Sequence, residues 1–130
     1  MTFSRIHAPV GWTMLFVFLA TGAYMRHIFP EAYEADSAVR FLYRSNHVYI
    51  LFSSLLNILA SYMNDVPLRW PKIFNLGSLF LSLSPVVLLA AFITETSIPS
   101  PTRPLTLSGA SLSLGGVLLL VLSRRNARKD

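Results

Sequence analysis

The residues best suited to ligand chemistry gather around one pair of expected helix ends. Basic and imidazole side chains occur there at Arg26, His27, Arg40, Arg44 and His47. Imidazole nitrogens bind haem iron or hydrogen-bond a quinone, and guanidinium groups bind phosphate and carboxylate oxygens. His47 is the strongest candidate, because it lies deepest and on the polar side of its apolar segment. These five residues, here called the basic end cluster, are the candidate ligand or headgroup site.

Two explanations of the basic end cluster remain open. Long basic side chains near a helix end can reach the phosphates of a lipid surface, with acidic partners in the adjoining segment 30–37. Alternatively, the cluster binds an anionic headgroup, a quinone or a partner protein. A bis-histidine haem would need two facing imidazoles. Only His27 is expected at the same end as His47, because antiparallel packing would keep His7 about 20 Å or more away.

The first apolar segment shows one resemblance to a known family. Its stretch from Arg5-Ile6-His7 to Gly22-Ala23-Tyr24-Met25 resembles the first helix of bacterial membrane-bound b-type cytochromes. The resemblance implies haem binding, for which that family uses further histidines on later helices. This chain has no histidine after His47, so we do not assign it to the family.

Neutral polar residues form a second candidate group, in the expected second and third helices. At roughly 100° per residue, one side of each helix carries three of them: Asn57, Ser54 and Ser61, and Asn75, Ser78 and Ser82. An amide inside a membrane costs free energy unless it is hydrogen-bonded. These six residues are the candidate polar interior, either as hydrogen bonds between helices or as a hydrophilic path for a substrate.

Four long apolar runs must position these side chains, and nearly all charges fall between them. The expected helices cover about residues 6–28, 37–63, 72–94 and 105–123. About 20 mostly apolar helical residues cross a bilayer core, so each run suffices for one crossing. Because the connecting segments are short, we predict an all-α integral membrane protein. Its single domain, residues 1–130, would hold four transmembrane helices in an up-down antiparallel bundle.

Composition excludes several other classes of protein. The 130 residues are 53% hydrophobic and 13% charged, with a mean hydropathy of +0.53, whereas soluble domains carry about 25% charged residues. The absence of cysteine excludes disulfides and thiolate ligands. The net charge of +5 comes from segments that flank the apolar runs, so we predict no nucleic-acid partner. No catalytic motif or metal-ligand spacing is recognisable, so we predict neither catalytic residues nor a metal site.

Basic residues are unequally divided between the two ends of the expected bundle. Four crossings would place both termini on one side. That side would hold Arg5, Arg69, Lys72, Arg124, Arg125, Arg128 and Lys129, and the other would hold Arg26, Arg40, Arg44 and Arg103. Because segments rich in Lys and Arg stay in the cytoplasm, we predict a bacterial inner-membrane protein with both termini cytoplasmic.

Small residues on the outer two helices suggest how the protein acts. Gly11 and Gly22 share one side of the first helix, and the fourth contains the spaced pairs Ser111/Gly115 and Gly109/Ser113. Such pairs let helices approach closely. We therefore expect a non-enzymatic accessory protein or complex subunit, without a cofactor, whose partners are the lipid bilayer and a membrane protein or a second copy.

Two other functions remain open at this stage. One is a redox subunit that binds haem or quinone near His47. The other is a small transporter that uses the polar interface between the second and third helices. Both need side chains from different helices to meet, which the sequence does not establish.

Overall fold

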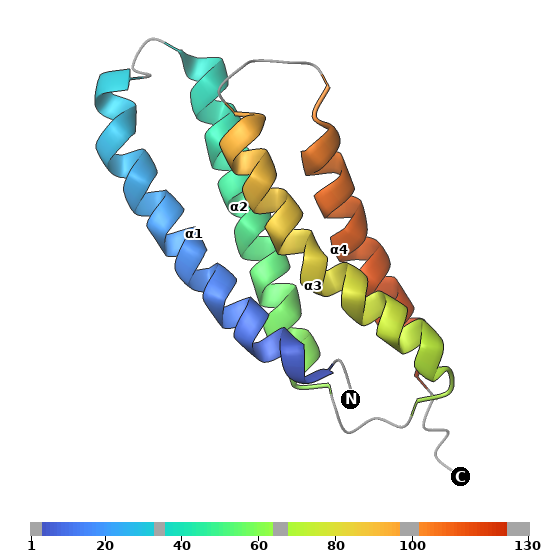
Figure 1. Ribbon diagram of the computed structural model, residues 1–130. Helices are drawn as coiled ribbons and strands as arrows, with labels where there is room; N and C mark the ends of the chain where they lie inside the picture. The colour runs from blue at the N-terminus through green and yellow to red at the C-terminus, as the bar shows by residue number, and fades with distance from the viewer. Residues whose placement is uncertain (1–3, 33–35, 64–67, 97–101, 125–130) are drawn as a thin grey trace.

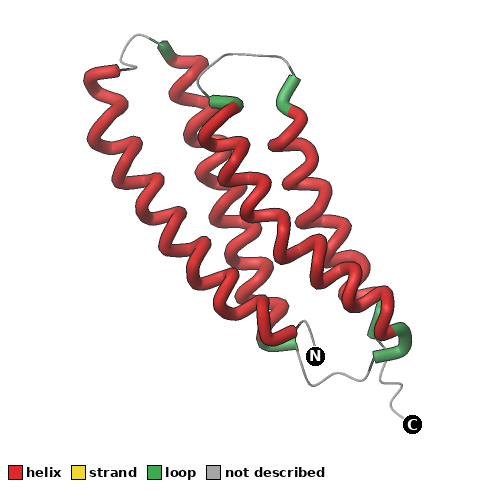
Figure 2. The backbone as a smooth tube through the Cα atoms, in the orientation of Figure 1, coloured by secondary structure: helices red, strands yellow, loops and turns green. Residues whose placement is uncertain are grey.

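A computed structural model describes residues 4–32, 36–63, 68–96 and 102–124 (Figure 1). Within these ranges the helices are α1 Ser4–Ala32, α2 Ser37–Ser61, α3 Pro71–Thr94 and α4 Pro104–Leu122. Figure 2 shows only short loops in the rest of the described chain. The prediction of an all-α chain with four helices is confirmed, although α1 extends beyond its expected range and α2 ends before Met63.

Local chemistry accounts for where three of these helices begin. The Asp36 carboxylate accepts a hydrogen bond from the Val39 N–H at 3.0 Å and so caps α2. Pro71 and Pro104 each occupy the first turn of their helices, α3 and α4. A proline costs nothing there, because the N–H that it lacks would have no partner within the helix.

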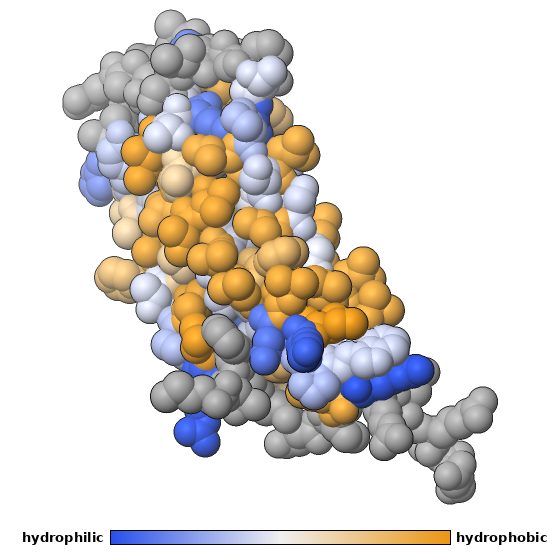
Figure 3. Space-filling view, turned by 45° about the vertical axis from the view of Figure 1, so that its right-hand side comes forward, coloured by the Kyte–Doolittle hydropathy of each residue, from blue (hydrophilic) through white to orange (hydrophobic). Residues whose placement is uncertain are grey.

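Three helices are long and apolar enough to cross a membrane: the segments Arg5–His27, Pro71–Thr94 and Pro104–Leu122. α2 falls outside this group because it contains arginine, histidine and asparagine side chains among its apolar ones. Its exposed side is nevertheless apolar, and includes Phe41, Val48 and Leu59. Figure 3 shows hydrophobic side chains over the middle of the molecule and hydrophilic ones concentrated toward its ends.

The helices pack as two antiparallel pairs that join through α2 and α3. In the first pair, Gly11 of α1 lies against Ile58 of α2, and Gly22 lies against His47. In the second pair, Gly77 of α3 lies against Leu119 of α4. The start of α1 and the end of α4 therefore lie at the same end of the molecule (Figure 1).

The interior contains two apolar clusters with polar residues between them on α2. One cluster includes Met14, Ile50 and Leu88, and the other includes Ala60, Phe74, Leu81 and Leu120. Ser53, Ser54 and Asn57, which lie between Ile50 and Ala60 along α2, are all fully buried. The core is therefore apolar in the two clusters and polar between them. The buried polar side chains between the clusters need hydrogen-bond partners, which neighbouring helices can supply.

Two adjacent glycines of α4 provide a test of this packing. A Cβ at Gly116 would lie 2.8 Å from the Leu81 backbone nitrogen and 2.9 Å from the Gly77 oxygen, whereas a Cβ at Gly115 would meet nothing within 4 Å. We expect Gly116→Ala to lower the free energy of unfolding by about 1–3 kcal/mol, because backbone atoms cannot yield easily. Gly115→Ala should be neutral or slightly stabilising. Reversible unfolding in mixed micelles, followed by circular dichroism, measures both, and equal effects would contradict the assigned α3–α4 contact.

Candidate functional site

A hydrogen-bonded junction of three helices lies in the interior, and His7 is at its centre. His7 is only 1% exposed. Its Nδ1 lies 2.9 Å from Oδ1 of Asn57 on α2, and its Nε2 lies 2.7 Å from Oγ of Ser78 on α3. Ser82 adds a weaker contact, with Oγ 3.4 Å from Nδ1. The imidazole therefore links α1, α2 and α3 at one level.

The partners of Asn57 determine the direction of these hydrogen bonds. Its Nδ2 donates to the carbonyl oxygens of Ser53 and Leu81, both at 2.9 Å. Both amide hydrogens are then used, so Oδ1 accepts the proton on Nδ1 of His7. In a neutral imidazole, Nε2 is left to accept a hydrogen bond from the Ser78 hydroxyl. The junction is thus fully paired, with one defined tautomer of His7.

The order Ser78–His7–Asn57 has the pattern of a nucleophile, a base and an orienting group. Hydrolytic chemistry would also require a substrate carbonyl to reach the Ser78 hydroxyl. Ser78 and Asn57 are both fully buried, however, and both hydrogen-bond to the buried His7. The arrangement is therefore suited to joining helices rather than to acyl transfer.

The predicted polar interior is distributed unevenly in the structure. Asn57 and Ser78 belong to the His7 junction, and Ser82 lies at its edge. Ser54 is buried and donates to the Gly11 carbonyl of α1 at 2.9 Å. Ser61 is partly buried and donates to Ile58 of its own helix. The structure thus brings Asn57, Ser78 and Ser82 together and places Ser54 between α1 and α2.

The placement of Asn75 in the polar interior is wrong, because this residue is exposed. The buried side of α3 is centred near Phe74 and Leu81 rather than on the polar residues. Asn75 lies roughly 100° around the helix from Phe74, beyond the edge of that side. The hydroxyls of Ser78 and Ser82 point inward from the same edge, which is why spacing alone grouped the three residues.

His7 was missed as a candidate because its position near the start of an apolar run is typical of a residue at the membrane surface. The position of His7 around the helix could have identified it as an interior residue. His7, Gly11 and Met14 recur at intervals of four and three residues, and all three are buried. A single inward-facing stripe on the first helix would therefore have placed His7 in the interior.

His47 lies between α1 and α2 toward the other end of the molecule. Its ring stacks on Phe18 with centroids 4.0 Å apart. Its Nδ1 lies 2.9 Å from Oγ1 of Thr21, and that hydroxyl donates to the Phe18 carbonyl at 2.9 Å. Because a hydroxyl has one proton, Oγ1 must accept from Nδ1, so Nε2 of His47 is the hydrogen-bond acceptor of the ring.

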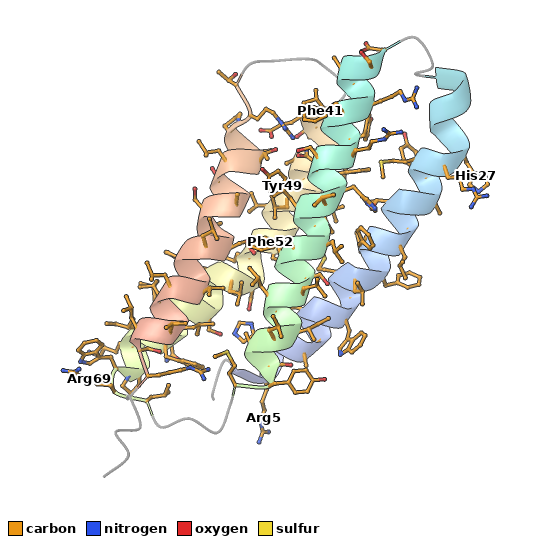
Figure 4. The ribbon with its side chains drawn as sticks, turned by 180° about the vertical axis from the view of Figure 1, so that it is seen from behind. Arg5, His27, Phe41, Tyr49, Phe52 and Arg69 are labelled. Atoms are coloured by element: carbon orange, nitrogen blue, oxygen red, sulfur yellow. The ribbon has the colours of Figure 1, made fainter. Side chains whose placement is uncertain are left out.

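The other members of the basic end cluster lie at or near the surface of the molecule. Arg26 and Arg44 are exposed, and Arg40 is partly buried. His27 is exposed on α1 and points away from α2 (Figure 4). His27 therefore lies on the side of α1 away from His47 of α2, and the two imidazoles do not face each other.

A third polar group, not anticipated from the sequence, joins α2, α3 and α4 near the same end. Glu95, which follows α3, accepts hydrogen bonds from the N–H groups of Leu105 at 2.6 Å and Thr106 at 2.9 Å. The Thr106 hydroxyl is within reach of Glu95 and of the buried Asn46, and Arg103 donates to the Asn46 side-chain oxygen. Glu95 thus caps the start of α4, which has no side-chain cap of its own.

The pKa of Glu95 reflects two opposing effects. Burial disfavours the charged carboxylate, but hydrogen bonds from the Thr106 side chain and from the Leu105 and Thr106 backbone favour it, as does the charge of Arg103. Together these contacts lower the pKa of Glu95 below its ordinary value. The carboxylate is therefore ionised where it meets the positive end of the α4 dipole.

In the described ranges, no group of three or more histidine, aspartate or glutamate side chains is arranged to hold a metal ion. Comparison with known proteins adds no assignment. No protein-family model matches the chain, and no curated protein or solved structure shows significant similarity to it. The geometry of the His7 junction and of the basic end cluster therefore provides the basis for a functional proposal.

Replacing Asn57 tests the His7 junction. We expect Asn57→Leu to lower the free energy of unfolding by about 1–3 kcal/mol, because His7 Nδ1 and the Leu81 carbonyl lose their partner in the interior. Asn75→Leu is the matched control, since it makes the same change at an exposed position of α3. Unfolding in mixed micelles measures the difference. A loss for Asn75→Leu as large as that for Asn57→Leu would contradict the junction.

The cap of α4 should make stability depend on pH. The pKa of Glu95 is lower in the folded state than the ordinary value of 4.5. Its contribution is therefore present above pH 4.5 and is lost as the pH falls through the lower folded pKa. Glu95→Gln should cost about 1 kcal/mol at neutral pH, as for other helix caps, and the difference from the native chain should shrink on acidification. Melting curves between pH 3 and 7 test this, and a difference independent of pH would refute it.

Proposed function

We propose that this chain is an integral protein of the bacterial inner membrane. All four helices would cross the bilayer in an up-down bundle, with both termini in the cytoplasm. Support comes from the three apolar helices and from the apolar exposed side of α2. The orientation rests on basic residues near the start of α1 and the end of α4, although Arg125, Arg128 and Lys129 lie outside the described residues.

Its activity, on this proposal, is that of a non-enzymatic accessory protein or complex subunit. The observation that favours this function is the way in which interior polar groups are used. Asn57, His7 and Ser54 each hydrogen-bond across helices, at distances near 2.9 Å. Such bonds fix the positions of the helices, whereas a transport path needs polar groups that water or a substrate can reach. The transporter alternative therefore has less support.

The outer side of α4 is the surface that we propose for a partner. Gly109 and Ser113, one of the two spaced small pairs, face the interior, where Gly109 contacts Leu88. The other pair, Ser111 and Gly115, lies on the outside, and Gly115 has open space beside it. A helix from a membrane protein or from a second copy can approach closely at such a pair.

Cysteine crosslinking in native membranes tests this function. Because the chain contains no cysteine, an introduced cysteine is the only thiol of this chain that can react. We expect Gly115→Cys to form a crosslinked species with a short bifunctional reagent, because the partner backbone lies close to this position. Phe16→Cys, at a residue that is 71% exposed on α1, is the control and should crosslink weakly.

The same samples separate membrane insertion from partner binding. After a carbonate wash, the chain should remain in the membrane pellet. Release into the soluble fraction would refute insertion. Retention in the pellet with equal crosslinking at both positions would refute only the proposed partner surface.

A further inference from the structure

Three arginines lie at one end of the α1–α2 pair. Arg26 and Arg44 are exposed and Arg40 is partly buried, whereas the side chains of Glu31 and Glu34 in the adjoining segment lie outside the described ones. The nearby Asp36 carboxylate is used as the cap of α2. Figure 4 shows nitrogen-bearing side chains between α1 and α2 toward the Phe41 end of the molecule. Three positive charges therefore lie at this end of the described part of the protein.

The register of the helices places these arginines at one level. Thr21 meets His47, and Tyr24 lies beside Tyr43 with ring centroids 6.5 Å apart. Because α1 and α2 are antiparallel, each step forward along α1 corresponds to a step backward along α2. Arg26, two residues beyond Tyr24, is then level with the stretch of α2 between Arg40 and Arg44.

Helical phase also places them on one edge of the α1–α2 interface. On α1, Arg26 is rotated by roughly 40° from Gly22, which faces α2. On α2, Arg44 is rotated by roughly 60° in the same sense from His47, which faces α1. In an antiparallel pair, rotations of the same sense bring both side chains to the same edge.

This edge is open to the surroundings of the bundle. α3 and α4 contact α2 on its other side, where Asn57 bonds to Leu81 and Asn46 bonds to Thr106. His47 forms the inner limit of the edge, with its ring fixed by Phe18 and Thr21. A Cβ at Gly22 would lie 3.2 Å from Cε1 and 3.5 Å from Nε2 of that ring. The His47 ring therefore packs closely against α1 at Gly22.

We infer that Arg26, Arg40 and Arg44 form a binding site for a phosphate group, which we name the anion site. Guanidinium groups from two helices suit the oxygens of a phosphate. Three positive charges along one edge favour an anion over a neutral quinone. A phosphate here belongs to an anionic lipid, because the site faces outward beside the apolar surface of α1 and α2. This inference rests on the proposed membrane insertion, but not on the proposed partner.

Lipid binding to delipidated protein in a neutral detergent tests the anion site. Native mass spectrometry would follow titration with phosphatidylglycerol, phosphatidylcholine and inorganic phosphate. We expect phosphatidylglycerol to bind at one saturable site and more tightly than phosphatidylcholine. Arg26→Gln and Arg44→Gln should each weaken that binding about fivefold, as expected for one basic residue near an anionic lipid. Inorganic phosphate should compete only weakly, since it lacks acyl chains.

Arg69→Gln and His27→Gln are the matched controls. Both residues are exposed, Arg69 at the opposite end of the molecule and His27 on the far side of α1 (Figure 4). Neither change should alter the affinity for phosphatidylglycerol. Equal losses for Arg69→Gln and Arg44→Gln would show nonspecific charge attraction and overturn the site. If inorganic phosphate bound the anion site as tightly as phosphatidylglycerol does, the assignment of a lipid as the ligand of this site would be overturned. A chain released by the carbonate wash would instead refute insertion itself.

Discussion

The pairing of polar atoms away from water is the constraint on which this bundle depends. A side-chain amide in a nonaqueous interior is costly unless the protein supplies its partners. Asn57 has one oxygen and two amide hydrogens to satisfy, and it uses all three, on His7 of α1, on Leu81 of α3 and on its own helix. One side chain of α2 thereby determines where both neighbouring helices lie.

Glycine makes these hydrogen bonds geometrically possible. Gly11 leaves so little space that an added Cβ would lie 2.6 Å from Ile58, and the short Ser54 side chain reaches the Gly11 carbonyl directly. Gly77 and Gly116 bring α3 and α4 equally close. Close backbone approach and polar pairing therefore reinforce each other.

Polar groups in the interior and groups at the surface of the bundle have different roles. Interior polar groups are used in the His7 junction and at the Glu95 cap, where they hold helices in place. The residues that are open to the surroundings lie outside the core. They are found on the edge of the α1–α2 pair that carries Arg44 and on the face of α4 that carries Gly115. Interior polar groups thus join helices, whereas the groups open to the surroundings lie at the surface.

The sequence by itself determined the four helices, because apolar runs of sufficient length, the Asp36 cap and the first-turn prolines are local features. It also identified Asn57 as a residue that needs partners. Only the tertiary structure decided that His7 is the partner, that Asn75 lies outside and that His27 faces away from His47. These outcomes depend on how each helix is rotated and which helix lies beside it. Both are set by contacts between residues far apart in the chain, such as Asn57 with His7, which local spacing does not record.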